Sequence, residues 1–130
     1  MRRRALAACR LLALASLFAA CYTGPRVPPG VLDVSGVWDG EWDGGFAGHG
    51  FIELTLTQTD TRVVGTLKIN GAPAISATDG ALEGHVIGDR FRFNQPVGAV
   101  DADLAVAGEE MRGQATGRLK IAMILHRRPR

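Results

Sequence analysis

The sequence predicts an all-β fold, an antiparallel up-and-down meander that closes into a small barrel of eight strands. From Ser35 onward, short runs of alternating apolar and polar residues are separated by Gly, Asp and Asn, which is typical of strands joined by tight turns. No window shows a sustained apolar repeat of 3.6 residues, so no amphipathic helix is expected. Three candidate turns also give one consistent inside and outside. These observations define the fold class, and the segments are considered below in chain order.

Residues 1–20 are predicted to be a signal peptide. A basic start, Arg2 to Arg4, precedes an uncharged apolar run of ten residues from Leu11 to Ala20, which is the layout of a secretory signal. A bilayer-spanning helix needs about 20 apolar residues, so export is favoured over a membrane span. Removing this segment takes away four arginines and changes the formal net charge from +2 to −2. The composition therefore gives no support for a nucleic-acid partner.

The two cysteines have different predicted fates. Leu-Ala-Ala-Cys, ending at Cys9, precedes the apolar run, whereas Phe-Ala-Ala-Cys, ending at Cys21, lies at the end of that run. By its position the second string resembles the lipobox of bacterial lipoproteins. The resemblance implies a diacylglycerol on the Cys21 sulfur, cleavage after Ala20, and attachment to the cell envelope, at the outer membrane in a Gram-negative host. The alternative is ordinary signal cleavage nearby, which leaves Cys21 as a free thiol; in neither case does the mature protein contain an intramolecular disulfide.

Residues 21–34 are predicted to be a tether, because the prolines and glycines at 24, 25 and 28–30 cannot extend a helix or a central strand. Such a spacer lifts the following domain, residues 35–130, off a lipid surface. Within this domain we expect strands over residues 36–43, 49–58, 62–70, 81–87, 90–95, 100–107, 111–117 and 119–127.

Two-residue turns at Asp60-Thr61, Gly88-Asp89 and Glu109-Glu110 fix the expected register of three hairpins. In the first hairpin one face is apolar, and the other pairs Glu53 with Lys68. The predicted pairs on the inner face are Ile52 with Ile69, Leu54 with Leu67 and Leu56 with Gly65 in the first hairpin, Val86 with Phe91 and Gly84 with Phe93 in the second, and Val106 with Gly113 and Leu104 with Ala115 in the third.

Closure of the meander removes the exposed edges that an open sheet would leave. Glycines at inward positions favour the barrel over the alternative, a two-sheet β-sandwich, because tight coiling needs such gaps. These glycines are Gly40, Gly65, Gly84 and Gly113.

The first strand begins with Gly36-Val37-Trp38, which resembles the Gly-x-Trp start of the calycins, the lipocalin and avidin group of ligand-binding barrels. The resemblance implies that Trp38 packs near the closed end of the barrel beneath a basic residue of the last strand, for which Arg127 and Arg128 are both candidates. The Gly-rich strands, including Gly65 to Leu67, are also similar to small β domains of bacterial lipoproteins, over residues 35–127.

The predicted interior is apolar, and it leaves two interpretations open. One is a pocket for a lipid-like or aromatic molecule, with Trp38, Trp42, Phe91 and Phe93 as the candidate ligand-binding residues. The other, favoured by the short strands, is a barrel filled by its own side chains. The expected interior residues are Trp38, Trp42, Ile52, Leu54, Leu56, Leu67, Ile69, Leu82, Val86, Phe91, Phe93, Leu104, Val106, Met111, Ile121 and Met123.

The sequence predicts no catalytic residue, metal ligand set or cofactor. Asp39, Glu41 and Asp43 alternate along one strand face and point in parallel, whereas calcium needs oxygens that converge. The three histidines are scattered without the spacing of zinc ligands.

We therefore expect a non-enzymatic lipoprotein that acts as a binding or structural module of the envelope. Its expected partners are the membrane, through the lipid on Cys21, and a small apolar ligand or an envelope protein. The alternative is an inhibitor of a secreted protease or lysozyme, although the calycin-like inhibitors usually contain a disulfide, and this chain has no cysteine pair in its domain.

Overall fold

The computed structural model describes residues 24–71, 79–95, 100–117 and 120–129, so both cysteines lie outside the described residues. Eight antiparallel strands follow one another around a closed barrel, and β1 pairs with β8 to complete it. The predicted fold class is thus confirmed, and the strands form the closed barrel and not the alternative two-sheet sandwich. The elements are β1 (Gly36–Asp43), the short 3-10 turn η1 (Gly45–Ala47), β2 (His49–Thr59), β3 (Arg62–Ile69), β4 (Gly80–Ile87), β5 (Arg90–Gln95), β6 (Val100–Ala107), β7 (Glu110–Thr116) and β8 (Ile121–Arg127).

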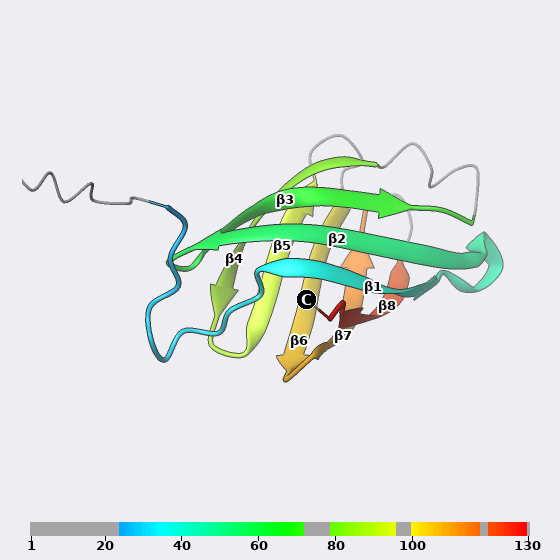
Figure 1. The fold of residues 1–130 in the computed structure, drawn as a ribbon. Coiled ribbons are helices and arrows are strands. Elements are labelled where there is room, and N and C mark those ends of the chain that lie inside the picture. Colours follow the sequence, from blue (N-terminus) through cyan, green and yellow to red (C-terminus); the bar gives the residue numbers. More distant parts are fainter. Residues whose placement is uncertain (1–23, 72–78, 96–99, 118–119, 130) are drawn as a thin grey trace, which may run out of the picture.

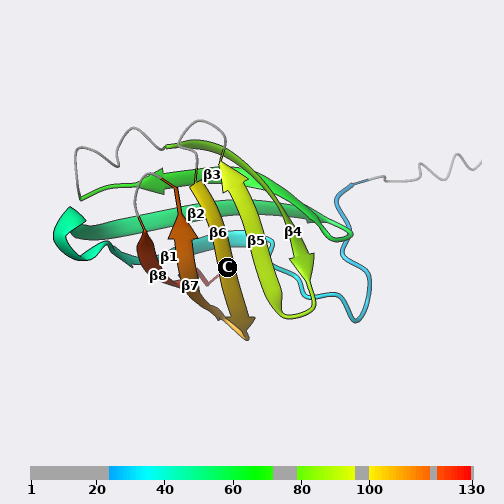
Figure 2. The same cartoon turned by 180° about the vertical axis from the view of Figure 1, so that it is seen from behind.

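The barrel is strongly twisted, and β1 to β3 run at a steep angle to β5 to β7 on the other side (Figures 1 and 2). Glycines permit this coiling where strand backbones approach closely. A Cβ atom on Gly40 of β1 would overlap the backbone of Ile124 in β8, and one on Gly65 of β3 would overlap the backbone of Thr55 in β2. The predicted need for glycine at inward positions therefore has a steric cause.

The predicted register is confirmed in two hairpins and wrong in the third. Leu54 pairs with Leu67, and Phe93 pairs with Gly84, as expected. In the third hairpin Val106 pairs with Met111 instead of Gly113, and Leu104 pairs with Gly113 instead of Ala115. The register is shifted by two residues, so every side chain keeps its predicted face.

Backbone conformation explains this correction. The first residue of each turn has a positive φ, 54° at Asp60, 59° at Gly88 and 60° at Gly108. The third turn is thus Gly108-Glu109, because the predicted turn at Glu109-Glu110 would have required a glutamate in the left-handed region.

The two ends of the barrel differ. At the end we call the closed end, the three two-residue turns lie beside the N-terminal segment (Figures 1 and 2). Here the second residue of each turn accepts a backbone hydrogen bond from a later strand, Thr61 from Val86, Asp89 from Val106 and Glu109 from Arg127, each at 2.8 Å. At the opposite end, the open end, β1 is followed by η1, and β3, β5 and β7 reach their last residues.

The core lies inside the barrel, and every residue of the predicted interior is buried. The structure adds the apolar residues Val34, Val63, Ala102, Ala115 and Leu125, and the amides Gln58 and Gln95. The described part of the chain contains no helix long and apolar enough to cross a membrane.

Candidate functional site

The N-terminal segment closes one end of the barrel. Residues 32–35, which we call the strap, cross the closed end, and Val34 within the strap is 0% exposed. The strap is the last part of the predicted tether together with the first residue of the predicted domain. Side chains of Gln58, Trp38 and Arg127, which we call the clamp, bind its main chain.

Gln58 holds the strap through both ends of its amide. Its Oε1 accepts a hydrogen bond from the Val34 N–H at 2.9 Å, and its Nε2 donates to the carbonyls of Leu32 and Asp60, both at 2.8 Å. The Gln58 backbone N–H also donates to Ser35 Oγ at 3.3 Å. Because Gln58 is only 1% exposed, these bonds replace water that its amide has lost.

Trp38 and Arg127 complete the clamp. The Trp38 indole N–H donates to the Val34 carbonyl at 2.9 Å. The guanidinium carbon of Arg127 lies 4.5 Å from the centroid of the Trp38 ring, a cation–π contact. Arg127 Nη2 donates to the Asp33 carbonyl at 2.7 Å, and Nη1 donates to the Ser35 carbonyl. Its Nε forms an ion pair with Glu109 at 3.0 Å without the alignment of a hydrogen bond.

The structure thus places Trp38 at the closed end beneath a basic residue of β8, and it selects Arg127 for that position. Arg128 instead points to the outer face of the barrel. There it contacts both carboxylate oxygens of Asp39, at 2.7 and 2.6 Å, and Glu53 at 2.9 Å. The hydrogen bond to Asp39, followed by the one to Glu53, raises the pKa of Arg128 above its usual value.

The Asp39 carboxylate is therefore paired with Arg128. The carboxylates of β1 face outward, as expected from their alternation along the strand. Among the described residues, no group of three or more His, Cys, Asp or Glu side chains is arranged to hold a metal ion.

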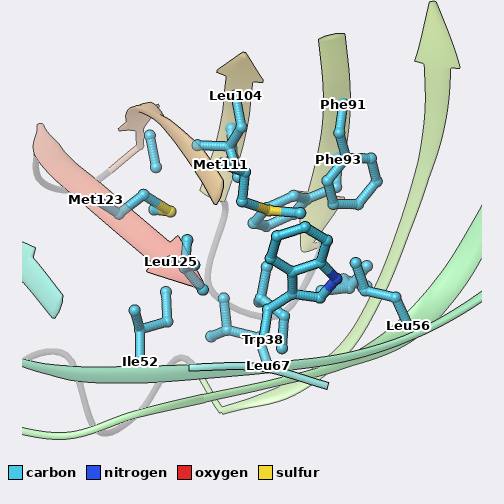
Figure 3. Close-up of a cluster of buried hydrophobic side chains, with 14 of the residues drawn as sticks. Trp38, Ile52, Leu56, Leu67, Phe91, Phe93, Leu104, Met111, Met123 and Leu125 are labelled. Carbon is cyan, nitrogen blue, oxygen red and sulfur yellow. The ribbon is translucent and has the colours of Figure 1, made fainter. Parts of the chain in front are cut away.

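Three of the four candidate ligand-binding residues lie together in the packed core. Figure 3 shows the Trp38 indole beside the rings of Phe91 and Phe93, with Met111 next to them. The Phe91 and Phe93 ring centroids are 5.4 Å apart and the planes are tilted by 34°. These side chains are at most 3% exposed, so they act as core residues in this conformation of the barrel.

Trp42 is separate from them, toward the open end. Its indole N–H donates to the Asn70 carbonyl at 2.7 Å. A Cβ atom on Gly44, just after β1, would meet Trp42 Cζ3 and Ile121 Cγ2 at 3.3 Å, so the Trp42 ring and Ile121 both lie close to the backbone of Gly44. The Asn70 backbone N–H donates to the Phe51 carbonyl, and the Phe51 N–H donates to Asn70 Oδ1, both at 3.0 Å. The open end is thereby bounded by an aromatic ring whose polar atom is already bound.

The η1 turn presents Phe46 fully to solvent beside the open end. The other member of the predicted site, the lipid-attachment residue Cys21, lies outside the described residues.

Gln58 is the site residue that sequence reasoning missed. Its signal was present, because it continues the inward alternation of Ile52, Leu54 and Leu56 along β2. A polar residue at an inward position next to a turn indicates a buried hydrogen-bond partner.

No protein-family model matches the chain, and no curated protein matches it. One similar solved structure is a mutant of the fluorescent protein UnaG, with a TM-score of 0.45 and 10% sequence identity over 75% of this chain and 97% of that chain. The similarity concerns the fold alone.

Proposed function

We propose that the protein is a lipid-anchored, non-enzymatic binding module of the cell envelope, which takes a small apolar ligand at the open end of its barrel. The observation that carries this proposal is the difference between the two ends. The strap and the clamp cover the closed end, whereas the open end has no such strap among the described residues and carries the Trp42 ring and the exposed Phe46 of η1.

The apolar character of the ligand follows from the inner side chains at the open end. Trp42, Ile69 and Ile121 are all buried there, and the Trp42 N–H is already bound to Asn70. Gln95, the last residue of β5, is the buried polar side chain at the same end. A ligand entering between Trp42, Ile69 and Ile121 meets mainly ring and aliphatic surface, which selects predominantly apolar molecules. Entry requires these side chains to move apart, since they are packed in the described structure.

The non-enzymatic part of the proposal is supported by the buried polar groups. In the described residues the buried polar side chains are the amides of Gln58 and Gln95. An amide does not titrate at physiological pH and does not act as a nucleophile. The anchoring part is supported by the position of Cys21 directly after the apolar run, and two acyl chains suffice to hold a protein stably on a bilayer.

Native mass spectrometry of the protein purified from its own host tests the proposal. A retained small hydrophobic molecule is the expected result. Trp42→Ala should reduce its retention, whereas Phe51→Ala, a matched aromatic change on the outer face, should not. A protein without any retained molecule that also fails to bind an apolar dye such as anilinonaphthalene sulfonate contradicts ligand binding. A co-purifying hydrolase would instead favour the inhibitor alternative.

A further inference from the structure

We infer that the strap holds the barrel with its closed end toward the membrane, so that the open end faces the aqueous compartment and receives a ligand from water. This inference rests on the anchoring of Cys21 proposed above. It adds a direction to that proposal, since a barrel presented in this way does not draw its ligand directly out of the bilayer.

The chain is fixed to the barrel very soon after the anchor. The backbone N–H of Asp60, in the β2–β3 turn, donates to the Arg26 carbonyl at 2.8 Å. Four residues separate Cys21 from Arg26. A fully extended chain covers about 3.3–3.6 Å per residue, so this piece reaches roughly 17 Å at most.

The strap, residues 32–35, is also fixed to the barrel, so the chain cannot bend freely there. Its backbone groups are bound by Gln58, Trp38 and Arg127, and Val34 is inserted into the core. Each of the three turns at this end accepts a backbone hydrogen bond from a later strand, which connects the turns into one unit. The strap and the closed end of the barrel therefore move together, and the tether cannot turn independently of the barrel at residues 32–35.

The open end lies farther away than the tether allows. β1 and β3 have eight residues each, which gives a length of about 26 Å. Strand tilt reduces the separation of the two ends to about 20 Å along the barrel axis. With Arg26 held near the membrane, the open end reaches the lipid only if the barrel lies on its side.

The wall beside Arg26 offers little to favour such a side-on arrangement. The outer faces of β2 and β3 next to the Asp60 turn carry the exposed threonines 55, 57, 59 and 66, with Arg62 and the 40% exposed Val64 among them. Farther from the turn, the oppositely charged Glu53 and Lys68 are cross-strand partners. A mostly polar wall with charges of both signs gains little from apolar burial or from attraction to anionic lipid.

Resonance energy transfer on vesicles tests the orientation. The mature chain, residues 21–130, is coupled through its single thiol, Cys21, to a maleimide phospholipid in phosphatidylcholine vesicles that carry an acceptor dye on their headgroups. Azidophenylalanine in place of Thr61, at the closed end, or of Phe46, at the open end, receives the donor; both positions are exposed. Transfer should be about twofold higher from position 61, because the strands set the two ends roughly 20 Å apart.

A longer tether provides the control. A flexible Gly/Ser insertion of about 20 residues after Thr23 has a root-mean-square length near 25 Å, and it should remove the difference between the two donors without altering the barrel. Equal transfer from both positions in the unmodified chain, or higher transfer from position 46, overturns the inference. The chemical coupling makes this result independent of native acylation, which the intact mass of the protein from its host decides separately.

Discussion

Arg127 and Arg128 are neighbours with the same charge, yet they do different work because strand alternation points them to opposite faces of β8. The Arg127 side chain is 17% exposed and stacks on Trp38 while it binds two strap carbonyls. The Arg128 side chain is 50% exposed and pairs with surface carboxylates. Surface ion pairs contribute little to stability, whereas removing a partly buried cation that is hydrogen-bonded to main-chain carbonyls costs more.

Arg127→Ala should therefore lower the free energy of unfolding by about 2–4 kcal/mol, since two carbonyls lose their donor and the Trp38 face loses its cation. Denaturant unfolding monitored by tryptophan fluorescence measures the loss. Arg128→Ala, the matched control, should cause a much smaller loss. Equal losses in the two variants would show that the clamp has no special role.

Asp103, on the outer face of the barrel, should make the stability of the fold depend on pH in the acid range. Arg90 Nε donates to its carboxylate at 2.7 Å, and Arg92 lies 3.5 Å away. The hydrogen bond from Arg90 is the main cause that lowers the pKa of Asp103 below its usual value of 3.8. A lowered pKa in the folded state means that this pair stabilises the fold at neutral pH.

That stabilisation should be lost as the pH falls through the lowered pKa of Asp103, below 3.8. Asp103→Asn should flatten the acid side of a plot of unfolding midpoint against pH, by a modest amount because the side chain is 41% exposed. Glu41→Gln, which removes an exposed carboxylate of β1, serves as the comparison. An Asn variant with the acid slope of the unmodified protein would contradict this assignment.

At the scale of the elements, alternation predicted which face of each strand is buried, and turn chemistry decided the register. Asp60 and Gly88 both accept the left-handed conformation, so the first two hairpins followed from their turns. The third failed because Glu109-Glu110 was chosen over Gly108-Glu109, although glycine is the residue that a positive φ favours. An error of two residues preserves the pattern of inside and outside, and alternation alone cannot detect it.

The close contact of β1 with β8 depends on Gly40. A side chain at this position would overlap the Ile124 backbone, which cannot move without separating the strands that close the barrel. Gly40→Ala should reduce the free energy of unfolding by about 3 kcal/mol or prevent folding, as overpacking at a rigid site does.

Gly44→Ala provides the control for this prediction. The added methyl group at position 44 meets only side-chain atoms, at 3.2–3.3 Å, which can adjust. Its effect should stay below about 1 kcal/mol. Thermal or denaturant unfolding of the two variants compares them, and a Gly40→Ala protein as stable as Gly44→Ala would show that β1 and β8 can separate without penalty.

At the scale of the whole molecule, the barrel was predictable because its evidence is local, in turns and in neighbouring strands. The clamp was only partly predictable, because it joins residues far apart in the chain; Arg127 and Ser35 are 92 positions from each other. The calycin resemblance supplied the pairing of Trp38 with a basic residue of the last strand. The sequence also held the signal that distinguishes Arg127 from Arg128, because the alternation that puts Ile121 and Met123 inside the barrel puts Arg127 on the inner side and Arg128 on the outer one.

The proposed attachment of the whole molecule to the envelope depends on which cysteine is the lipid acceptor. Cys21 follows the apolar run and Cys9 precedes it, so in the proposed scheme Cys21 is the residue presented at the membrane surface after export. Cys21→Ala should leave a soluble or uncleaved product, and Cys9→Ala should change neither processing nor membrane association. Detergent phase partitioning and the intact mass of the protein from its host measure both effects.

Because the barrel makes no disulfide with Cys21 in this scheme, its unfolding midpoint should be the same in the Cys21→Ala protein, which separates loss of the anchor from loss of the fold. The opposite pattern, with Cys9 required and Cys21 dispensable, would mean that the match of letters outweighs position relative to the apolar run.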